Sequence, residues 1–183
     1  MPSTKQRNNK VGMDTNFWKL TYVFYMNMLG KVQIVRLNMD VIGLVQCGAQ
    51  KKATAAPAKD LYISSLFKKS KSFVESKCDK WFILSAKYGL LLPEQVVEPY
   101  NETLKSYSVK ERAIWAESVF EDISKHINSG DKIIFLAGNC YGQFLIPKLQ
   151  AMGIQIEVPM KGLRIGEQLH YLDVQNQRNN YEK

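Results

Sequence analysis

Four short apolar runs, each followed by glycine or other small residues and then by a helix-like stretch, constrain the fold more than any other feature of the sequence. The runs are Val41–Val45, Trp81–Leu84, Ile133–Leu136 and Ile154–Val158. Nearly continuous apolar runs of this length are typical of strands buried on both faces, as in parallel sheets. Strands that alternate with helices predict an α/β fold with a doubly wound, mainly parallel sheet of about four to five strands, flanked by helices in three layers.

Helix signals lie between these runs. Pro57 opens a lysine-rich amphipathic stretch that predicts a helix to about Lys77, with a break near Ser64–Ser65. Ser108 and Glu111 have the spacing of a capping box, which predicts the start of a second helix. The stretch between the third and fourth apolar runs predicts a third helix.

The domain organisation follows from length and from shifts in composition. A chain of 183 residues predicts one domain, and we expect it to be an α/β domain over residues 39–175, with a tail over residues 176–183. The N-terminal extension, residues 1–38, begins with a polar stretch without periodicity, residues 1–16, which predicts flexibility. Residues 17–37 are aromatic and then alternate like a short strand, which predicts an accessory element. Self-association or partner docking through this element is an alternative role.

Charge and cysteine content limit the classes of function. The formal net charge is +8, and the first 38 residues hold six basic residues and one acidic residue. This balance favours nucleic acid or another phosphate-bearing partner. Cys47, Cys78 and Cys140 form no C-x-x-C pair, which argues against a disulfide framework and a structural zinc site. Without a signal peptide or a bilayer-spanning apolar run, we expect a cytoplasmic protein that needs no membrane, metal or cofactor.

The carboxyl ends of the expected strands define the candidate site, because open α/β sheets bind ligands there. Glycines at strand ends let a ligand approach the backbone, lysines hold phosphate, and tyrosines frame a base. Lys51 and Lys52 lack the spacing of a P-loop, so a solvated turn is the alternative there. Asn139 is expected to read a base edge, or alternatively to cap the following helix. The candidate binding residues are Cys47, Gly48, Lys51, Lys52, Tyr62, Ser85, Tyr88, Gly89, Tyr100, Asn101, Gly138, Asn139, Tyr141 and Lys161.

Three carboxylates and one amine are the candidate catalytic groups. Hydrolysis of an N-glycosidic bond needs a carboxylate that activates water or stabilises positive charge on the sugar. Asp60, Glu98 and Glu102 are the candidates for this role. Lys87 is a candidate phosphate ligand or amine nucleophile. The alternative for each of these four side chains is a solvent-facing charge without a catalytic role.

Several motifs, taken in order, resemble a family catalogued as a domain of unknown function. The residues that carry the resemblance are Cys47-Gly48 with Lys51-Lys52, Ala58–Tyr62, Leu84–Leu90, Pro99-Tyr100 with Thr103-Leu104, Ala137-Gly138 with Tyr141, and Gly162–Gly166. They span about residues 41–172 of the chain. The family is distantly similar to uracil-DNA-glycosylase-like proteins and to phage-defence glycosylases that remove modified bases.

The resemblance implies a base flipped into a pocket and attack of water at the sugar carbon. It also implies an Asp at the position of Asn101; if that Asp is catalytic, activity in this chain is weakened, lost, or dependent on Glu98, Glu102 or Asp60. We therefore expect a nucleobase- or nucleotide-directed hydrolase that cleaves the N-glycosidic bond of a modified base, with DNA as its partner. The alternative is a non-enzymatic nucleic-acid or nucleotide-binding module that uses the same pocket.

Overall fold

The computed structural model describes residues 20–26 and 32–181 of the chain. The chain forms two compact units, residues 1–39 and residues 40–183. None of the helices in the described ranges is long and apolar enough to cross a membrane.

The described part of the first unit is a β-hairpin. Strand β1 (Leu20–Met26) pairs antiparallel with strand β2 (Val32–Asn38). The strand that we expected in the second half of residues 17–37 is confirmed, and Leu20–Met26 in the first half form a strand as well. The polar stretch, residues 1–16, and residues 17–19 lie outside the described residues. Self-association through this segment stays a prediction.

The second unit is built on a five-stranded mixed sheet with the strand order β6-β5-β3-β8-β9. The strands are β3 (Val41–Gln46), β5 (Lys80–Ser85), β6 (Gly89–Leu91), β8 (Lys132–Leu136) and β9 (Gln155–Glu157). All neighbouring pairs run parallel except β5 and β6, where the edge strand is antiparallel. The predicted mainly parallel sheet is therefore confirmed.

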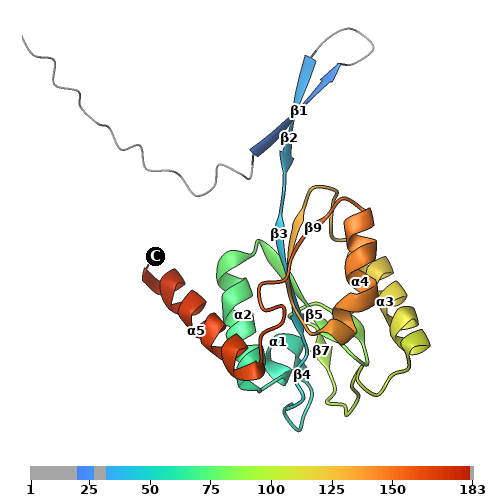
Figure 1. The fold of residues 1–183 in the computed structure, drawn as a ribbon, viewed down its shortest axis with the longest axis vertical. Helices are drawn as coiled ribbons and strands as arrows, with labels where there is room; N and C mark the ends of the chain where they lie inside the picture. Colours follow the sequence, from blue (N-terminus) through green and yellow to red (C-terminus); the bar gives the residue numbers. More distant parts are fainter. Residues whose placement is uncertain (1–19, 27–31, 182–183) are drawn as a thin grey trace, which may run out of the picture. The chain divides into compact units, whose positions relative to one another are not determined.

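Helices cover both faces of the sheet. They are α1 (Ala58–Leu61), α2 (Ser65–Lys77), α3 (Val109–Ile123), α4 (Asn139–Ala151) and α5 (Ile165–Tyr181). Figure 1 shows α2 and α5 side by side on one face of the sheet, and α3 and α4 side by side on the other. The chain thus forms the three layers that were predicted from the alternation of strands and helices.

Strand β3 forms the centre of the sheet because its side chains are apolar on both faces. Ile42 and Leu44 are fully buried between the two helical layers. Gly43 lies between them, and a Cβ atom at this position would come within 2.6 Å of the Cγ1 atom of Val74 on α2. Glycine therefore allows α2 to pack closely against the middle of β3.

The local signals for helix boundaries are confirmed. The backbone N–H of Ser108 donates to Glu111 Oε2 at 2.7 Å, and the Glu111 N–H donates to Ser108 Oγ, which completes the capping box of α3. The predicted break near Ser64–Ser65 separates α1 from α2. The third predicted helix is α4, which ends just before Gly153, a residue with positive φ.

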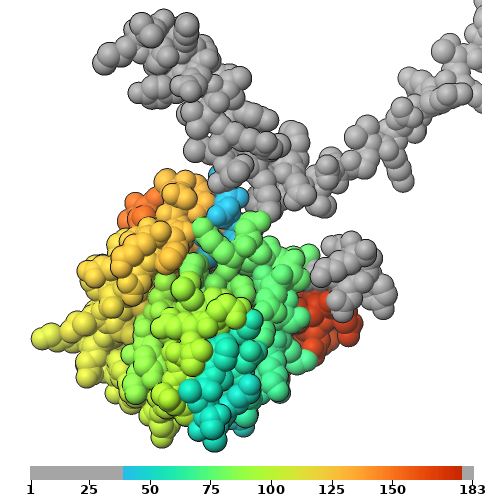
Figure 2. Space-filling view, turned by 180° about the vertical axis from the view of Figure 1, so that it is seen from behind, coloured from blue at the N-terminus to red at the C-terminus, as the bar shows by residue number. Residues whose placement is uncertain are grey.

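Several elements were not predicted from the sequence, among them the edge strand β6. Another is the short pairing of β4 (Ala56–Pro57) with β7 (Val96–Val97), which joins segments that lie next to each other in Figure 2. A third is α5, which continues past residue 176, where we had expected a tail. Contacts with α2 stabilise it: Asp173 forms an ion pair with Lys69, and the ring of Tyr171 packs against that of Phe73. Such contacts between distant segments leave no periodic signal in the sequence.

Candidate functional site

The order of the strands creates a crevice at the carboxyl edge of the sheet. β3 and β8 are parallel neighbours, but the chain leaves β3 toward α2 on one face and leaves β8 toward α4 on the other. This divergence is the topological switch point at which open α/β sheets bind ligands. A cavity of about 1040 Å³ lies there, lined by residues that follow β3 and β8 and by the segment before α5.

The charge of this cavity is positive. Lys105 and Lys161 line it, whereas none of the described residues in its wall is an Asp or a Glu. The first turns of α2 and α4 also contribute to the wall, through Ser64, Leu66, Gly138 and other residues.

These two helices differ from the other three at their N-termini. Neither α2 nor α4 has an acidic residue in its first turn or a side-chain cap, whereas α1, α3 and α5 carry Asp60, Glu111 and Glu167 there. Uncompensated helix N-termini present N–H groups and partial positive charge. The cavity therefore suits an anion.

A glutamine links the two strand ends across the crevice. Gln46, the last residue of β3, accepts a hydrogen bond at its Oε1 atom from the N–H of Gly138, at 2.9 Å. This bond joins residues 92 positions apart in the chain and fixes the amide plane at the cavity wall. Gln168 also lines the cavity, and its Nε2 atom donates to the carbonyl of Leu163 at 2.8 Å. The walls thus contain amides whose orientation is set by backbone partners.

A cluster of buried hydroxyl groups lies beside the cavity at the end of β5. Ser85, which is fully buried, exchanges a hydrogen bond of 2.8 Å with the hydroxyl of Tyr100, and Tyr100 exchanges one of 3.1 Å with Tyr62. The N–H of Tyr88 donates to Ser85 Oγ, and the indole of Trp115 donates to the Ser85 carbonyl at 2.9 Å. Ser85 therefore organises this cluster, which we call the hydroxyl cluster.

Cys47 connects the cavity to the hydroxyl cluster. It lines the cavity, and its Sγ atom lies 3.4 Å from the hydroxyl of Tyr141. Burial raises the pKa of Tyr62 to about 12, and burial also raises the pKa values of Tyr100 and Tyr141. These tyrosines are therefore neutral hydroxyls at physiological pH, which orient their neighbours by hydrogen bonding and carry no charge.

Lys51 covers the outer side of the cluster. Its Nζ atom lies 4.2 Å from the centroid of the Tyr100 ring, a distance typical of a cation–π contact. Loss of solvent around the amine lowers the pKa of Lys51, and the nearby Cys47 opposes that shift. Within the described part of the chain, Lys51 forms no ion pair with a carboxylate.

The structure divides the predicted binding residues into groups. Cys47, Gly48, Gly138, Asn139 and Lys161 all line the cavity, so residues that follow β3, β8 and β9 lie at one place, whereas the residues that follow β5 are not part of its wall. The hydroxyl cluster and its neighbours hold Lys51, Tyr62, Ser85, Tyr88, Tyr100 and Tyr141. Outside both groups lie Lys52 and Asn101, which are exposed, and Gly89, which begins β6 with a φ of 69°.

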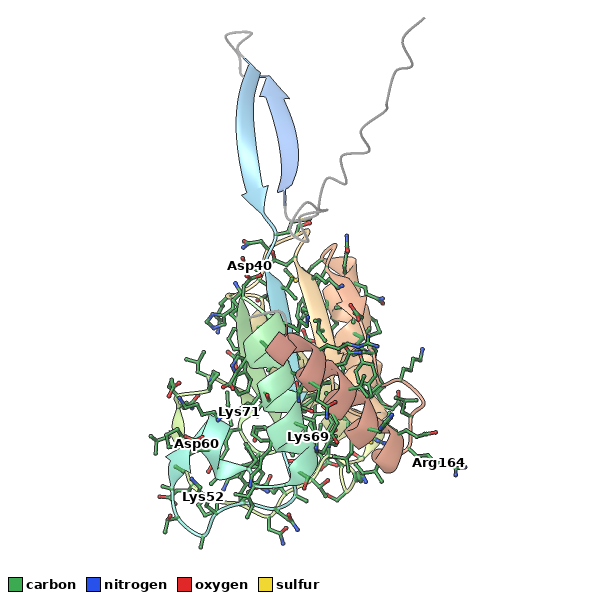
Figure 3. The ribbon with its side chains drawn as sticks, turned by 90° about the vertical axis from the view of Figure 1, so that its left-hand side faces the viewer. Asp40, Lys52, Asp60, Lys69, Lys71 and Arg164 are labelled. Carbon is green, nitrogen blue, oxygen red and sulfur yellow. The ribbon has the colours of Figure 1, made fainter. Side chains whose placement is uncertain are left out.

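The predicted catalytic groups lie outside the cavity wall. Asp60 forms an ion pair of 3.0 Å with Lys71 on α2, seen in Figure 3, and this hydrogen bond lowers the pKa of Asp60. Glu98 is exposed, and Lys87 extends beside the ring of Tyr88.

Glu102 accepts a hydrogen bond of 3.0 Å from the hydroxyl of Tyr107, a residue near the end of β5. Of the three carboxylates, Glu102 is therefore the one tied to the strand-end region, and it is three residues from the cavity-lining Lys105.

Sequence reasoning missed several residues of the site. Gln46 belongs to none of the predicted motifs, although it directly precedes Cys47. A motif that began at the last residue of the strand, and not at the residue after it, would have included Gln46. Ser64, Lys105 and Gln168 carry no local signal, because they reach the cavity through the packing of α2, α5 and a loop. No group of three or more His, Cys, Asp or Glu residues that could hold a metal ion occurs among the described residues.

Comparison with known proteins identifies a family. A model of a family described as a family of unknown function, DUF6884, matches residues 42–174, which include the cavity wall and the five-stranded sheet except for Val41, the first residue of β3. No curated protein and no solved structure matches the chain.

Proposed function

We propose that this chain, which belongs to the DUF6884 family, binds a nucleotide in the cavity at the switch point, either free or as one unit of a nucleic acid. The observation that carries the proposal is the charge of the cavity. Two lysines and two uncapped helix N-termini face it, and no carboxylate is among the described residues of its wall. A phosphate group is the anion that helix N-termini and lysines most often hold.

The size and the walls of the cavity favour a nucleotide over a small inorganic anion. A volume of about 1040 Å³ is at the upper end of the range for small-molecule sites, which is about 300–1,000 Å³. Apolar side chains such as Phe67, Phe135 and Ile156 line one part, and the amides of Gln46 and Gln168 line another. Apolar surface for a ring together with a few oriented amides is typical of a site for a heterocyclic base.

Titration calorimetry with a 5′-mononucleotide, its nucleoside and inorganic phosphate tests the proposal. The mononucleotide should bind at least about tenfold more tightly than the nucleoside, because only it presents a phosphate. The double variant Lys105→Ala, Lys161→Ala should remove this advantage. A matched control is Lys125→Ala, which removes a lysine that pairs with Asp122 on the far end of α3. No binding of any mononucleotide to folded protein would overturn the proposal.

Hydrolysis of an N-glycosidic bond is the second candidate function, and the position of Glu102 favours it over Asp60 and Glu98. In this reaction the water oxygen adds to the sugar carbon, the carbon–nitrogen bond breaks, and the base leaves with the bonding electrons; the proton that the water loses finally protonates the base. Glu102 would accept the proton of the attacking water. Its bond from Tyr107 holds it on the segment that reaches the cavity through Lys105.

The assay for this second function is release of base from plain and modified DNA, followed as abasic sites. Glu102→Gln, which keeps an acceptor for Tyr107, should lower the rate at least about a hundredfold. Glu98→Gln, four residues earlier and exposed, is the matched control and should retain the rate. Equal rates for the two variants would exclude Glu102, and absence of base release from all substrates, with nucleotide binding intact, would leave a binding module.

A further inference from the structure

We infer that the nucleotide bound in the cavity belongs to a single-stranded nucleic acid, whose neighbouring units lie on a rim of lysines and tyrosines beside the cavity. The inference rests on the proposed function and names the form of its ligand. The rim consists of Lys51, Lys87, Tyr88, Tyr100, Lys105 and Tyr107, and we call it the lysine–tyrosine rim.

The rim is continuous with the cavity. Lys105 lines the cavity, and two residues further along the chain the Tyr107 hydroxyl donates to the Ala86 carbonyl at 3.4 Å. Lys87 is the next residue after Ala86, and its amine lies 5.2 Å from the ring centroid of Tyr88.

Beyond this point the rim continues to the loop after β3. The rings of Tyr88 and Tyr100 stand perpendicular to each other with centroids 5.3 Å apart, and Lys51 lies over Tyr100. Loops that follow β3, β5 and β7 therefore form one surface. Their common position is the carboxyl edge of the sheet.

The lysines of the rim have no carboxylate partner among the described residues, unlike many lysines on the helices and at the strand starts. Ion pairs with Asp or Glu are formed, among the described residues, by lysines such as Lys59, Lys69, Lys71, Lys80, Lys125, Lys132 and Lys148. Lys51, Lys87 and Lys105 form no ion pair with any of the described residues. Glu98 and Glu102 lie on the same edge, but Glu102 is bonded to Tyr107 and neither carboxylate neutralises a rim lysine. A phosphate backbone would supply the missing negative charge.

The aromatic rings point to a single strand over a duplex. Tyr88, Tyr100 and Tyr107 are half-buried, and a lysine amine lies beside the rings of Tyr88 and Tyr100. Rings in a basic groove stack on unpaired bases, whereas the bases of a duplex are already stacked on each other. A free mononucleotide would fill the cavity and leave these rings and lysines without a ligand.

Fluorescence anisotropy with labelled oligonucleotides tests the inference. Affinity should rise at least about tenfold from a mononucleotide to a pentanucleotide, and the gain should fall with salt because phosphates outside the cavity release counterions. A duplex of the same sequence should bind no more tightly than the mononucleotide. The double variant Lys51→Met, Lys87→Met should reduce the affinity ratio of pentanucleotide to mononucleotide at least about fivefold.

The matched control is Lys125→Met, Lys148→Met, which removes the same charge from ion-paired lysines in the turn after α3 and on α4 and should leave that ratio unchanged. Thermal melts of both double variants establish that they are folded. If a mononucleotide binds as tightly as the pentanucleotide, or a duplex as tightly as the single strand, the inferred role of the rim is overturned. Either result leaves the proposed function standing. Failure of every nucleotide and oligonucleotide to bind overturns the proposed function as well.

Discussion

The two edges of the central sheet satisfy their polar groups in opposite ways. At the amino edge, backbone N–H groups donate hydrogen bonds to carboxylates. Asp131, which is 1% exposed, accepts from the N–H of Asp40 at 2.9 Å and from the N–H of Asn128 at 2.7 Å. Asp79 accepts from the N–H of Val41 at 2.8 Å. The start of β3 and the turn before β8 are thus tied together by side chains of the protein itself.

At the carboxyl edge, comparable groups are left for something else to bind. The first turns of α2 and α4 have neither a side-chain cap nor an acidic residue, and the lysines of the cavity have no carboxylate partner among the described residues. Figure 3 shows the two edges at opposite ends of the sheet, with Asp40 at one and Lys52 at the other. The difference teaches that the amino edge stabilises the fold, whereas the carboxyl edge holds its donors ready for a ligand.

The largest effect is expected for Asp131→Ala at the amino edge, which tests this contrast. The variant removes a buried carboxylate and leaves two partly buried backbone N–H groups without their acceptor, so the free energy of unfolding should fall by about 2 kcal/mol. Urea denaturation measures the loss, and Asp131→Asn, which keeps one acceptor oxygen, should lose less. Nucleotide affinity of the folded variant should match that of the wild type, and a parallel loss of affinity would break the contrast between the edges.

A smaller loss of stability is expected from Ser85→Ala at the carboxyl edge. Its hydroxyl accepts from the N–H of Tyr88 and shares a hydrogen bond with Tyr100, and both partners would lose this bond at a fully buried position. The expected cost is about 1–2 kcal/mol. Exposed Ser72→Ala on α2 is the control and should cost almost nothing. An equally small effect at Ser85 would mean that the hydroxyl cluster does not support the strand end.

The buried tyrosines predict a loss of stability at alkaline pH. Tyr62 has a pKa raised by burial to about 12, compared with 10.0 in the unfolded chain. The neutral form is therefore favoured by folding, so the stabilisation is complete below pH 10 and is lost as the pH rises toward 12. The cost should reach about 1 kcal/mol at pH 11 for this residue. Tyr62→Phe should flatten the pH dependence measured by denaturation between pH 9 and pH 11, whereas a variant as steep as the wild type would contradict the assignment.

The sequence predicts the second unit well wherever hydrophobic pattern alone decides. The four apolar runs, the capping box at Ser108 and the break near Ser64–Ser65 all correspond to observed boundaries. Helix α5 and the β4–β7 pairing escape prediction, because contacts with distant segments and not local periodicity stabilise them.

The candidate site is predictable only as far as the strand ends. The rule that ligands bind beyond the carboxyl ends led to Gly48, Gly138 and Lys161, which line one cavity. It does not tell which of several loops closes over that cavity, so Lys105 and Ser64 were missed. Nor does a carboxylate in a suggestive motif reveal its partner: Asp60 forms its ion pair with Lys71, eleven residues along the chain.

The smallest change in stability is expected for Asp60→Asn. This variant tests whether Asp60 is a carboxylate that only forms an ion pair or one that takes part in the reaction. The Asp60–Lys71 pair is partly solvated, so its loss should change the free energy of unfolding by at most about 0.5 kcal/mol at neutral pH. The hydrogen bond from Lys71 lowers the pKa of Asp60. The stabilisation by this pair is therefore present above the pKa of an ordinary Asp, about 4, and is lost as the pH falls through the lowered pKa of Asp60. Denaturation at pH 7 and pH 3 measures the difference, with Asp122→Asn in the exposed pair with Lys125 as control. Nucleotide affinity and any base release should be unchanged in Asp60→Asn, since the carboxylate already has its partner outside the cavity; a large loss of either would place Asp60 in the site after all.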